Sequence, residues 1–233
     1  MITTTTMSFR FKQFFIDDNK CAMKVGTDGV LLGAWCPKGT RILDVGTGSG
    51  LIARMLMQRF PEAQVEGIDI DEQTVSQAIQ NGVKTYVSRV QNWQIVNRQS
   101  SNRKLYDLIV SNPPYFQNSL KNPDKGREMA RHTDTLSYED LVHHSARLLT
   151  ENGQLALILP AQAETEIRQL AAAEGLYLTH VTRVYSKEGK PAKRVLLAFS
   201  HQPSVVREDA LVLEDEKGGR SAAYSELCRD FYL

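Results

Sequence analysis

What this 233-residue sequence lacks excludes several kinds of protein. Its three cysteines, Cys21, Cys36 and Cys228, are too few and too scattered for a disulfide framework or a zinc site. No apolar run approaches the length of a membrane span, and the N-terminal segment has no signal-peptide core. The formal charge is only +1, so any nucleic-acid-binding surface must be local. We therefore expect a cytoplasmic protein without a metal or a membrane partner.

The composition, with 42% hydrophobic and 24% charged residues, is typical of a soluble globular protein. The length suits one large domain, and no repeat or linker indicates a second. We expect a monomeric single domain with an N-terminal cap segment (1–40), a core (41–200) and a C-terminal extension (201–233). The threonine run at the N-terminus predicts a frayed tail, which makes Met7 a candidate for the natural start.

Apolar, strand-like runs alternate with amphipathic helical patterns through the core, which predicts a mostly parallel sheet with helices on both faces. The strand-like runs are 41–45, 65–70, 106–111, 154–160, 177–186 and 195–200. The last two have only a turn-rich segment between them and predict an antiparallel hairpin at one edge. Segment 86–104 is expected to hold a further strand, although its second half has the composition of a loop.

A glycine-rich turn joins the first strand to the first helix. The sequence DVGTGSG places Gly46, Gly48 and Gly50 where the backbone can approach a ligand closely and a helix N-terminus offers N–H groups. The spacing differs from the GxGxxG of dinucleotide-binding folds. A turn that only needs a flexible backbone is the alternative interpretation.

Acidic residues on both sides of this turn narrow the choice of ligand. Asp69 ends the second strand, 19 residues after Gly50, where a carboxylate can accept both hydroxyls of a ribose. Asp71 is a candidate to share that role, and a solvated strand-end acid is the alternative. Asp44 puts negative charge where a dinucleotide would hold its pyrophosphate. S-adenosylmethionine, which has a ribose and an ammonium group but no phosphate, suits the site better, with its carboxylate on the helix N–H groups and its ammonium facing Asp44.

The strand at 106–111 ends in Asn112, Pro113, Pro114 and Tyr115. Neither proline can donate a hydrogen bond to a neighbouring strand, and a residue that precedes proline is held extended. The Asn112 amide is therefore fixed in one direction at the carboxyl end of a strand.

The glycine loop and the later NPPY motif together resemble the class I, Rossmann-like methyltransferases that methylate planar nitrogens. The resemblance implies an α/β fold with a seven-stranded sheet whose last strand is antiparallel. It also implies that the Asn112 side-chain oxygen and the Pro113 carbonyl accept the N–H bonds of an adenine amine, orient its lone pair and stabilise the developing positive charge. The prolines, Pro114 included, fix these acceptors, and the Tyr115 ring offers a face on which the base stacks.

Segments along the whole chain resemble the bacterial tRNA(Val) adenine N6-methyltransferase family, whose target is adenosine 37. They are FRFKQFF, CAMKVGTDGVLLGAW, REMARHTDTL, KRVLLAFS and YSELCRDFYL. The resemblance implies an enzyme that uses S-adenosylmethionine to methylate tRNA. It also places Lys24, Thr27 and Asp28 near the polar end of the cofactor, although an N-terminal cap would explain the glycines around them equally well.

One position departs from the pattern of that family. The third strand usually ends in an Asp that binds the amino group of the cofactor adenine, and the alignment of SRVQNW puts Arg89 there. Arginine cannot accept a hydrogen bond. Gln91, Asn92 or the backbone is then the substitute, so this contact stays unassigned.

Two basic loops follow strands that should end at the same carboxyl edge as the site. Basic groups near a base-stacking tyrosine suit a phosphate-bearing substrate, although charged loops are often merely solvated. The candidates for tRNA contact are Lys121, Lys125, Arg127, Arg131, Lys190, Lys193 and Arg194.

Rival classes share parts of this pattern. Guanine N2-methyltransferases of RNA remain open, because their motif is often NPPF. Protein glutamine N5-methyltransferases carry a helical domain before the glycine loop, whereas only 43 residues precede Asp44 here. DNA adenine methyltransferases need a target-recognition region for which the chain has no spare segment. A noncatalytic cofactor-binding subunit would show a broken glycine loop or a lost Asn112, and the sequence shows neither.

Overall fold

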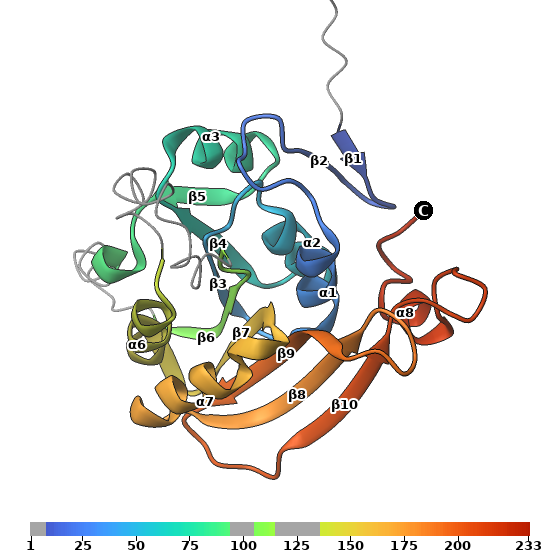
Figure 1. Ribbon diagram of the computed structural model, residues 1–233. Helices are drawn as coiled ribbons and strands as arrows, with labels where there is room; N and C mark the ends of the chain where they lie inside the picture. Colours follow the sequence, from blue (N-terminus) through green and yellow to red (C-terminus); the bar gives the residue numbers. More distant parts are fainter. Residues whose placement is uncertain (1–7, 94–104, 115–135) are drawn as a thin grey trace, which may run out of the picture.

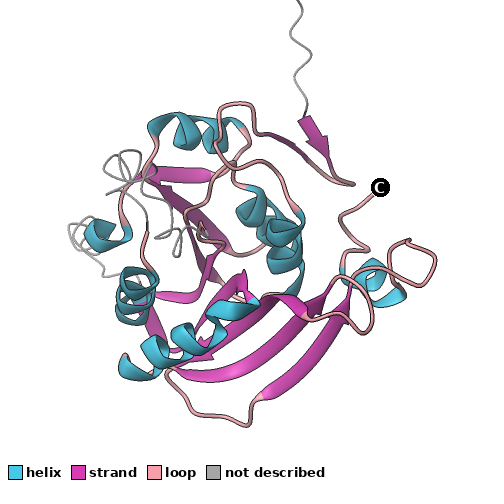
Figure 2. Cartoon of the chain, viewed as in Figure 1, coloured by secondary structure: helices cyan, strands magenta, loops and turns pink. Residues whose placement is uncertain are grey.

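The computed structural model describes residues 8–93, 105–114 and 136–233 of the chain. A twisted sheet forms its centre and helices cover both faces (Figures 1 and 2). The strands of this sheet are β3 (Arg41–Val45), β4 (Gln64–Asp69), β5 (Lys84–Val87), β6 (Tyr106–Ser111), β7 (Leu149–Pro160), β8 (Tyr177–Tyr185), β9 (Ala192–Ser200) and β10 (Arg207–Val212). Their order is β10-β8-β9-β7-β6-β3-β4-β5. A separate two-stranded sheet pairs β1 (Ser8–Arg10) with β2 (Phe15–Asp17).

Strand direction confirms the predicted α/β class. Neighbours from β5 through β7 run parallel, while β9 runs antiparallel to both β7 and β8. The predicted hairpin is present as β8–β9, but β9 lies inside the sheet between β7 and β8, not at its edge.

The edge strand is β10, which comes from the C-terminal extension and makes this an eight-stranded sheet instead of the expected seven. The sequence of β10 shows no apolar alternation. The strand begins with Arg207, Glu208 and Asp209, and only Leu211 is buried. Charged residues are the usual protection of an edge strand, and they conceal such a strand from a search for apolar patterns.

The helices form two layers that each bury a hydrophobic core against one face of the sheet. They are α1 (Thr27–Trp35), α2 (Leu51–Arg59), α3 (Glu72–Gln80), α6 (Tyr138–Leu148), α7 (Glu164–Ala173) and α8 (Ala222–Leu227), with a short 3₁₀ helix η2 (Ala161–Ala163). Helices α1, α2 and α8 contribute to one core, and α6 and α7 to the other. Ser137 caps α6 by accepting the Asp140 N–H, at 3.0 Å.

Helix α1 shows that the expected cap segment is partly core. Its residues 29–34 are all buried. A Cβ added at Gly33 would lie 2.7 Å from the Met55 sulfur, so glycine permits the close approach of α1 to α2. Helix α1 therefore belongs to one of the two helix layers that cover the sheet.

The strand expected within 86–104 was placed too late. Strand β5 begins at Lys84, directly after Gly82 turns the chain with a φ of 84°. A four-residue strand with polar residues has too little apolar pattern to stand out in the sequence. Residues 94–104 lie outside the described part of the chain.

Candidate active site

The site lies at the carboxyl edge of the sheet, where β3, β4 and β6 end as neighbours. The Ser111 hydroxyl, which is fully buried, donates to the Val45 carbonyl at 2.7 Å. This bond ties the end of β6 to the end of β3, so that Asn112 begins beside the glycine loop. Sequence reasoning missed Ser111, whose only signal was a serine at the end of an apolar strand.

The glycine loop has the backbone conformation that its sequence predicts. Gly46, Gly48 and Gly50 have φ angles of 69°, 56° and 81°, a region that side chains with a Cβ rarely occupy. A Cβ added at Gly46 or Gly48 would meet no atom within 4 Å. The space over the loop is therefore open to a ligand.

Most of the loop N–H groups hold the loop itself. Those of Gly46 and Thr47 donate to the Ile68 carbonyl at 2.9 and 3.1 Å. That of Gly48 donates to the Asp69 carboxylate at 3.0 Å, and that of Gly50 donates to the Thr47 carbonyl at 2.9 Å. Because these donors are engaged, the loop is poorly suited to hold a pyrophosphate, in agreement with the prediction from its spacing.

Asp44 lies beneath the loop and does not line the cavity. Its side chain is fully buried, and Oδ2 accepts the Thr47 hydroxyl at 2.7 Å and the Ala53 N–H at 3.2 Å. The Ala53 bond caps the N-terminus of α2 from a neighbouring strand. Asp44 therefore holds the loop, and its interaction with a ligand ammonium stays a prediction.

The second oxygen of Asp44, Oδ1, is buried and has no hydrogen-bond partner among the described residues. Burial raises the pKa of this carboxyl group from its ordinary 3.8 to about 7. An orphaned, desolvated carboxylate beneath the cavity floor favours a ligand that carries positive charge.

Asp69 ends β4 with both carboxylate oxygens facing backbone donors. Oδ2 accepts the Gly48 N–H at 3.0 Å and Oδ1 accepts the Asp71 N–H at 3.1 Å. Each oxygen has a further lone pair, so both can also accept a ribose hydroxyl. Burial raises the pKa of Asp69 despite these bonds. Asp71 also lines the cavity and caps α3 by accepting the Thr74 N–H at 2.7 Å, and its sharing of the ribose stays a prediction.

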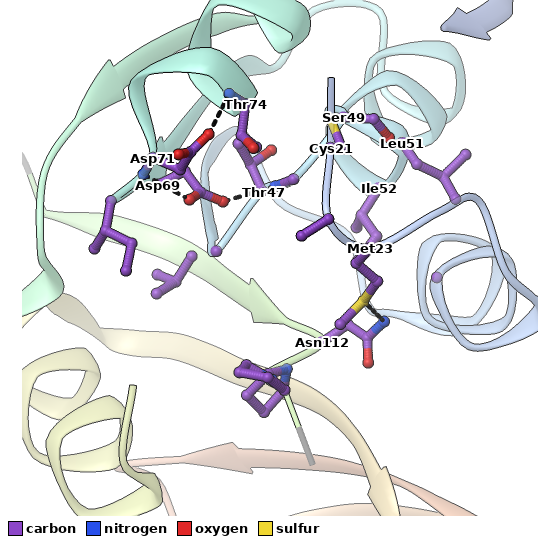
Figure 3. A pocket seen from close by; sticks show the side chains of 18 of the residues that line it. Cys21, Met23, Thr47, Ser49, Leu51, Ile52, Asp69, Asp71, Thr74 and Asn112 are labelled. Carbon is purple, nitrogen blue, oxygen red and sulfur yellow. Dashed lines mark hydrogen bonds between the residues drawn. The ribbon is translucent and has the colours of Figure 1, made fainter. Parts of the chain in front are cut away.

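A cavity of about 850 Å³ runs along this edge of the sheet, a volume typical of small-molecule sites. Figure 3 shows Asp69 and Asp71 on one side of it and Asn112 with Met23 on the other, with Thr47 of the glycine loop between them. The cavity wall is built from residues 20–29, 45–49, 68–71, 88–91 and 112–114, with Leu51, Ile52, Gln73, Thr74 and Leu136.

Residues 17–26, which we call the N-terminal strap, close one side of the cavity. Asp18 shapes the strap, because its carboxylate accepts the Val25 N–H at 2.7 Å and its carbonyl accepts the Lys24 ammonium at 2.7 Å. Lys24, Thr27 and Asp28 all line the cavity as predicted, and their contact with a cofactor stays a prediction.

Asn81 joins the strap to the glycine loop. Its side chain is buried, donates to the Asp17 carbonyl at 2.7 Å and to the Ser49 carbonyl at 2.8 Å, and accepts the Asp17 N–H at 3.1 Å. In the sequence, Asn81 is only an asparagine at the end of a helix before a glycine, which is common at helix ends. Its role depends on partners more than 30 positions away.

Asn112, Pro113 and Pro114 all line the cavity, and Pro113 is buried. The amide nitrogen of Asn112 lies 3.9 Å from the Met23 sulfur, and its oxygen points away from that sulfur (Figure 3). Tyr115 lies outside the described residues. The Asn112 amide therefore lies at the cavity wall, and its role as an acceptor stays a prediction.

The third-strand position that departs from the expected pattern also lines the cavity. Residues 88–91, Arg89 included, form part of its wall. Of the two suggested substitutes for the missing Asp, Gln91 lines the cavity and Asn92 does not. Gln91 is therefore the better side-chain candidate for an adenine contact.

The predicted RNA-binding residues divide into two groups. Lys121, Lys125, Arg127 and Arg131 lie outside the described residues. Lys190 is exposed in the turn between β8 and β9, and Lys193 is exposed at the start of β9.

Arg194 differs from the other candidates because it pairs with Asp28 at 2.8 Å. Both residues of the pair are partly buried, and Asp28 lines the cavity. An RNA phosphate would have to compete with the Asp28 carboxylate for Arg194. The predicted RNA contact of Arg194 is therefore weaker than those of Lys190 and Lys193.

Two kinds of feature were searched for and not found within the described ranges, which omit 1–7, 94–104 and 115–135. No group of three or more His, Cys, Asp or Glu side chains is placed to hold a metal ion there. No helix of that part of the chain is long and apolar enough to cross a membrane.

The residues at the cavity fit S-adenosylmethionine. Asp69 offers acceptors for a ribose, the open space over Gly46 and Gly48 admits a ligand, and the orphaned Asp44 oxygen favours a cation. Gln91 and the neighbouring wall are available for the adenine, while Lys24 and Thr27 line the part of the wall formed by the strap.

Comparison with solved structures supports the same class. The fold is similar to that of a predicted O-methyltransferase from Agrobacterium tumefaciens, with a TM-score of 0.67, 19% identity, and 88% of this chain and 96% of that chain covered. It is also similar to a ribosomal protein L11 methylase from Lactobacillus delbrueckii subsp. bulgaricus, with a TM-score of 0.53, 18% identity, and 81% and 84% covered. Fold and site together define a class I methyltransferase.

Sequence comparison specifies the family. A family model described as the methyltransferase small domain matches residues 25–173. The tRNA1(Val) (adenine(37)-N6)-methyltransferase of Bacteroides fragilis strain YCH46 is 43% identical over 232 residues, with 97% of each chain covered. The enzyme of the same description from Tolumonas auensis is 42% identical, again with 97% of each chain covered. The chain therefore belongs to the methyltransferase small domain family and, within it, to the tRNA1(Val) (adenine(37)-N6)-methyltransferases.

We expect Asp69→Ala to weaken the binding of S-adenosylmethionine by about one to two decades, because hydrogen bonds to a charged acceptor contribute about 1.5–3 kcal/mol. Isothermal titration calorimetry measures this directly. Glu62→Gln, at an exposed acid outside the cavity wall, is the control and should bind normally. Wild-type affinity in Asp69→Ala would remove this residue from the site.

The raised pKa of Asp44 predicts proton release when the cationic cofactor binds near neutral pH. In the folded protein this carboxyl group keeps its proton from about pH 4 up to about pH 7, whereas the unfolded chain releases it, so its contribution lowers stability as pH rises through that window. A nearby positive charge reverses the shift and expels the proton. Affinity should therefore increase as the pH rises from 6 to 8.

Calorimetry in buffers of different ionisation enthalpy measures the released protons. Asp44→Asn should abolish the release and flatten the loss of stability between about pH 4 and pH 7. Identical proton release in wild type and Asp44→Asn would show that another group titrates.

Proposed function

We propose that this protein transfers the methyl group of S-adenosylmethionine to the exocyclic N6 amine of adenosine 37 in tRNA1(Val). The observation that carries the proposal is the position of Asn112, which lies on the cavity wall opposite Asp69 (Figure 3). A cofactor whose ribose is held at Asp69 can extend along the glycine loop toward Asn112. The relatives of this chain support the choice of target.

The chemistry explains why an amide is used. The exocyclic amine of adenine is a poor nucleophile, because its lone pair is delocalised into the ring. The Asn112 oxygen accepts one of its N–H bonds and the Pro113 carbonyl accepts the other, which orients the lone pair and stabilises positive charge on the nitrogen. When bound, S-adenosylmethionine supplies an electrophilic methyl group on a positively charged sulfur.

Two contacts support a fixed position for these proposed acceptors. Pro113 is buried, and the Ser111 bond to Val45 fixes the strand end that precedes Asn112. The acceptors are therefore preorganised before the substrate arrives, which is the main requirement of this kind of catalysis. The methylated nitrogen is acidic enough to lose its proton to solvent, so no general base is required.

The target must leave its stack to reach Asn112, at a cost of a few kcal/mol for a stacked base. Phosphate contacts at the carboxyl edge offset that cost. Exposed Lys190 and Lys193 are placed to supply such contacts, and Lys121, Lys125, Arg127 and Arg131 are proposed to contribute from the loop after Tyr115. Tyr115 is proposed to stack on the extruded base.

Guanine N2-methylation is the second candidate, because Asn112 and Pro113 would accept the N–H bonds of a guanine amine equally well. Mass spectrometry of nucleosides from tRNA incubated with labelled cofactor distinguishes the two. N6-methyladenosine at position 37 is expected. Detection of N2-methylguanosine instead would refute adenosine methylation and support the second candidate.

Asn112→Ala should lower the single-turnover rate by about 10²–10³-fold, because one preorganised acceptor of the transition state is lost. Cofactor affinity should change little, since the acceptor faces the substrate. A rate near that of wild type would refute the amide-acceptor mechanism, and lost cofactor affinity would indicate a collapsed site instead.

Reversal of charge at Lys190 and Lys193 should lower tRNA affinity and flatten its salt dependence. Each phosphate contact contributes about 0.7–0.9 to the slope of log K against log salt concentration. The matched control reverses Lys38 and Arg147, which are also exposed but lie before β3 and β7, at the opposite edge of the sheet. Equal effects of both pairs on filter-binding isotherms would show that only net charge matters.

A further inference from the structure

A side chain of the N-terminal strap lies beside the Asn112 amide. The Met23 sulfur lies 3.9 Å from the amide nitrogen of Asn112, within reach of a weak N–H···S hydrogen bond (Figure 3). Met23 is 46% exposed, so packing in a core does not explain why it lies here. The two residues are separated by 89 positions in the sequence.

The backbone around Met23 is held on both sides. The Cys21 N–H donates to the Asp18 carbonyl at 3.0 Å, and the Val25 N–H donates to the Asp18 carboxylate at 2.7 Å. Asn81 then ties the neighbouring Asp17 to the glycine loop. The strap therefore brings the sulfur to a defined place beside Asn112.

An asparagine amide can adopt two orientations that differ by a flip of its oxygen and nitrogen. Only one of them offers an oxygen to the N–H group of a substrate amine, because the other presents two N–H donors to it. With the nitrogen beside Met23, the oxygen points away from the sulfur. The opposite flip would set the oxygen against the sulfur, and both are acceptors.

We propose that Met23 is a positioning residue that selects the catalytic orientation of the Asn112 amide. The inference deepens the proposed function and rests on it. The thioether accepts the amide N–H of Asn112, and this contact keeps the oxygen available to the substrate amine while the site is being filled.

Met23→Leu tests the idea, because leucine keeps most of the apolar volume and removes the acceptor. We expect the single-turnover rate to fall about two- to fivefold, the range of one weak hydrogen bond, with cofactor affinity unchanged. Met57→Leu is the matched control, since Met57 lies on α2 outside the cavity wall, and its rate should not change. An unchanged rate in Met23→Leu would overturn the proposal.

Testing Met23→Leu in combination with a second substitution, at Asn112, distinguishes a positioning role of Met23 from a packing role. Asn112→Asp carries an oxygen on both sides of its carboxylate, so it needs no selection of orientation. Met23→Leu should therefore not lower the rate of Asn112→Asp. An equal loss in both backgrounds would assign Met23 a packing role and overturn the proposal.

Nuclear magnetic resonance gives a measurement that does not depend on activity. A nuclear Overhauser effect is expected between the Asn112 side-chain amide protons and the Met23 methyl group, and its absence would refute the contact. The nuclear Overhauser effect tests the contact between Met23 and Asn112 where the rate of Asn112→Asp is too low to compare. Near-normal activity of Asn112→Ala would instead refute the proposed function, and the two failures are thus distinguishable.

Discussion

The buried carboxylate of Asp44 is the constraint on which the active site depends. It lies between β3 and α2, accepts the Thr47 hydroxyl and the Ala53 N–H, and so fixes both ends of the glycine loop. Burial without full hydrogen bonding is costly, and the raised pKa of this group is the direct result. A cationic cofactor relieves part of that cost. The same carboxylate that shapes the glycine loop therefore also favours a positively charged ligand.

A second set of hydrogen bonds brings three distant segments to this loop. Ser111 fixes the end of β6 beside Val45, and Asn81 fixes the N-terminal strap beside Ser49. The cofactor wall, the substrate acceptor and the strap are thereby held by buried polar bonds between side chain and backbone. Such bonds are strongly directional, and a buried donor or acceptor left without a partner costs about 1–3 kcal/mol. The site is consequently rigid at the positions where methyl transfer requires alignment.

The pair of Asp28 and Arg194 links the cofactor side of the cavity to the surface proposed for RNA. Asp28 belongs to the first turn of α1 and lines the cavity, while Arg194 belongs to the start of β9 near exposed Lys193. Two residues that the sequence assigned to different ligands are thus bonded to each other. The cofactor cavity and the surface proposed for RNA therefore meet at this one ion pair.

The sequence by itself determined the features that depend on local backbone chemistry. Three glycines predicted a turn with positive φ, and two prolines predicted an abrupt strand end at Asn112. Apolar periodicity predicted a parallel sheet between two layers of helices. Only the tertiary structure decided the rest: that β10 completes the sheet, that Asp44 supports the loop from below, and that Ser111, Asn81 and Met23 meet their partners. The physical reason is the range of the interactions. Backbone preferences act between neighbours and are visible in a short pattern, whereas a side-chain hydrogen bond across 32, 66 or 89 positions exists only after the chain has folded.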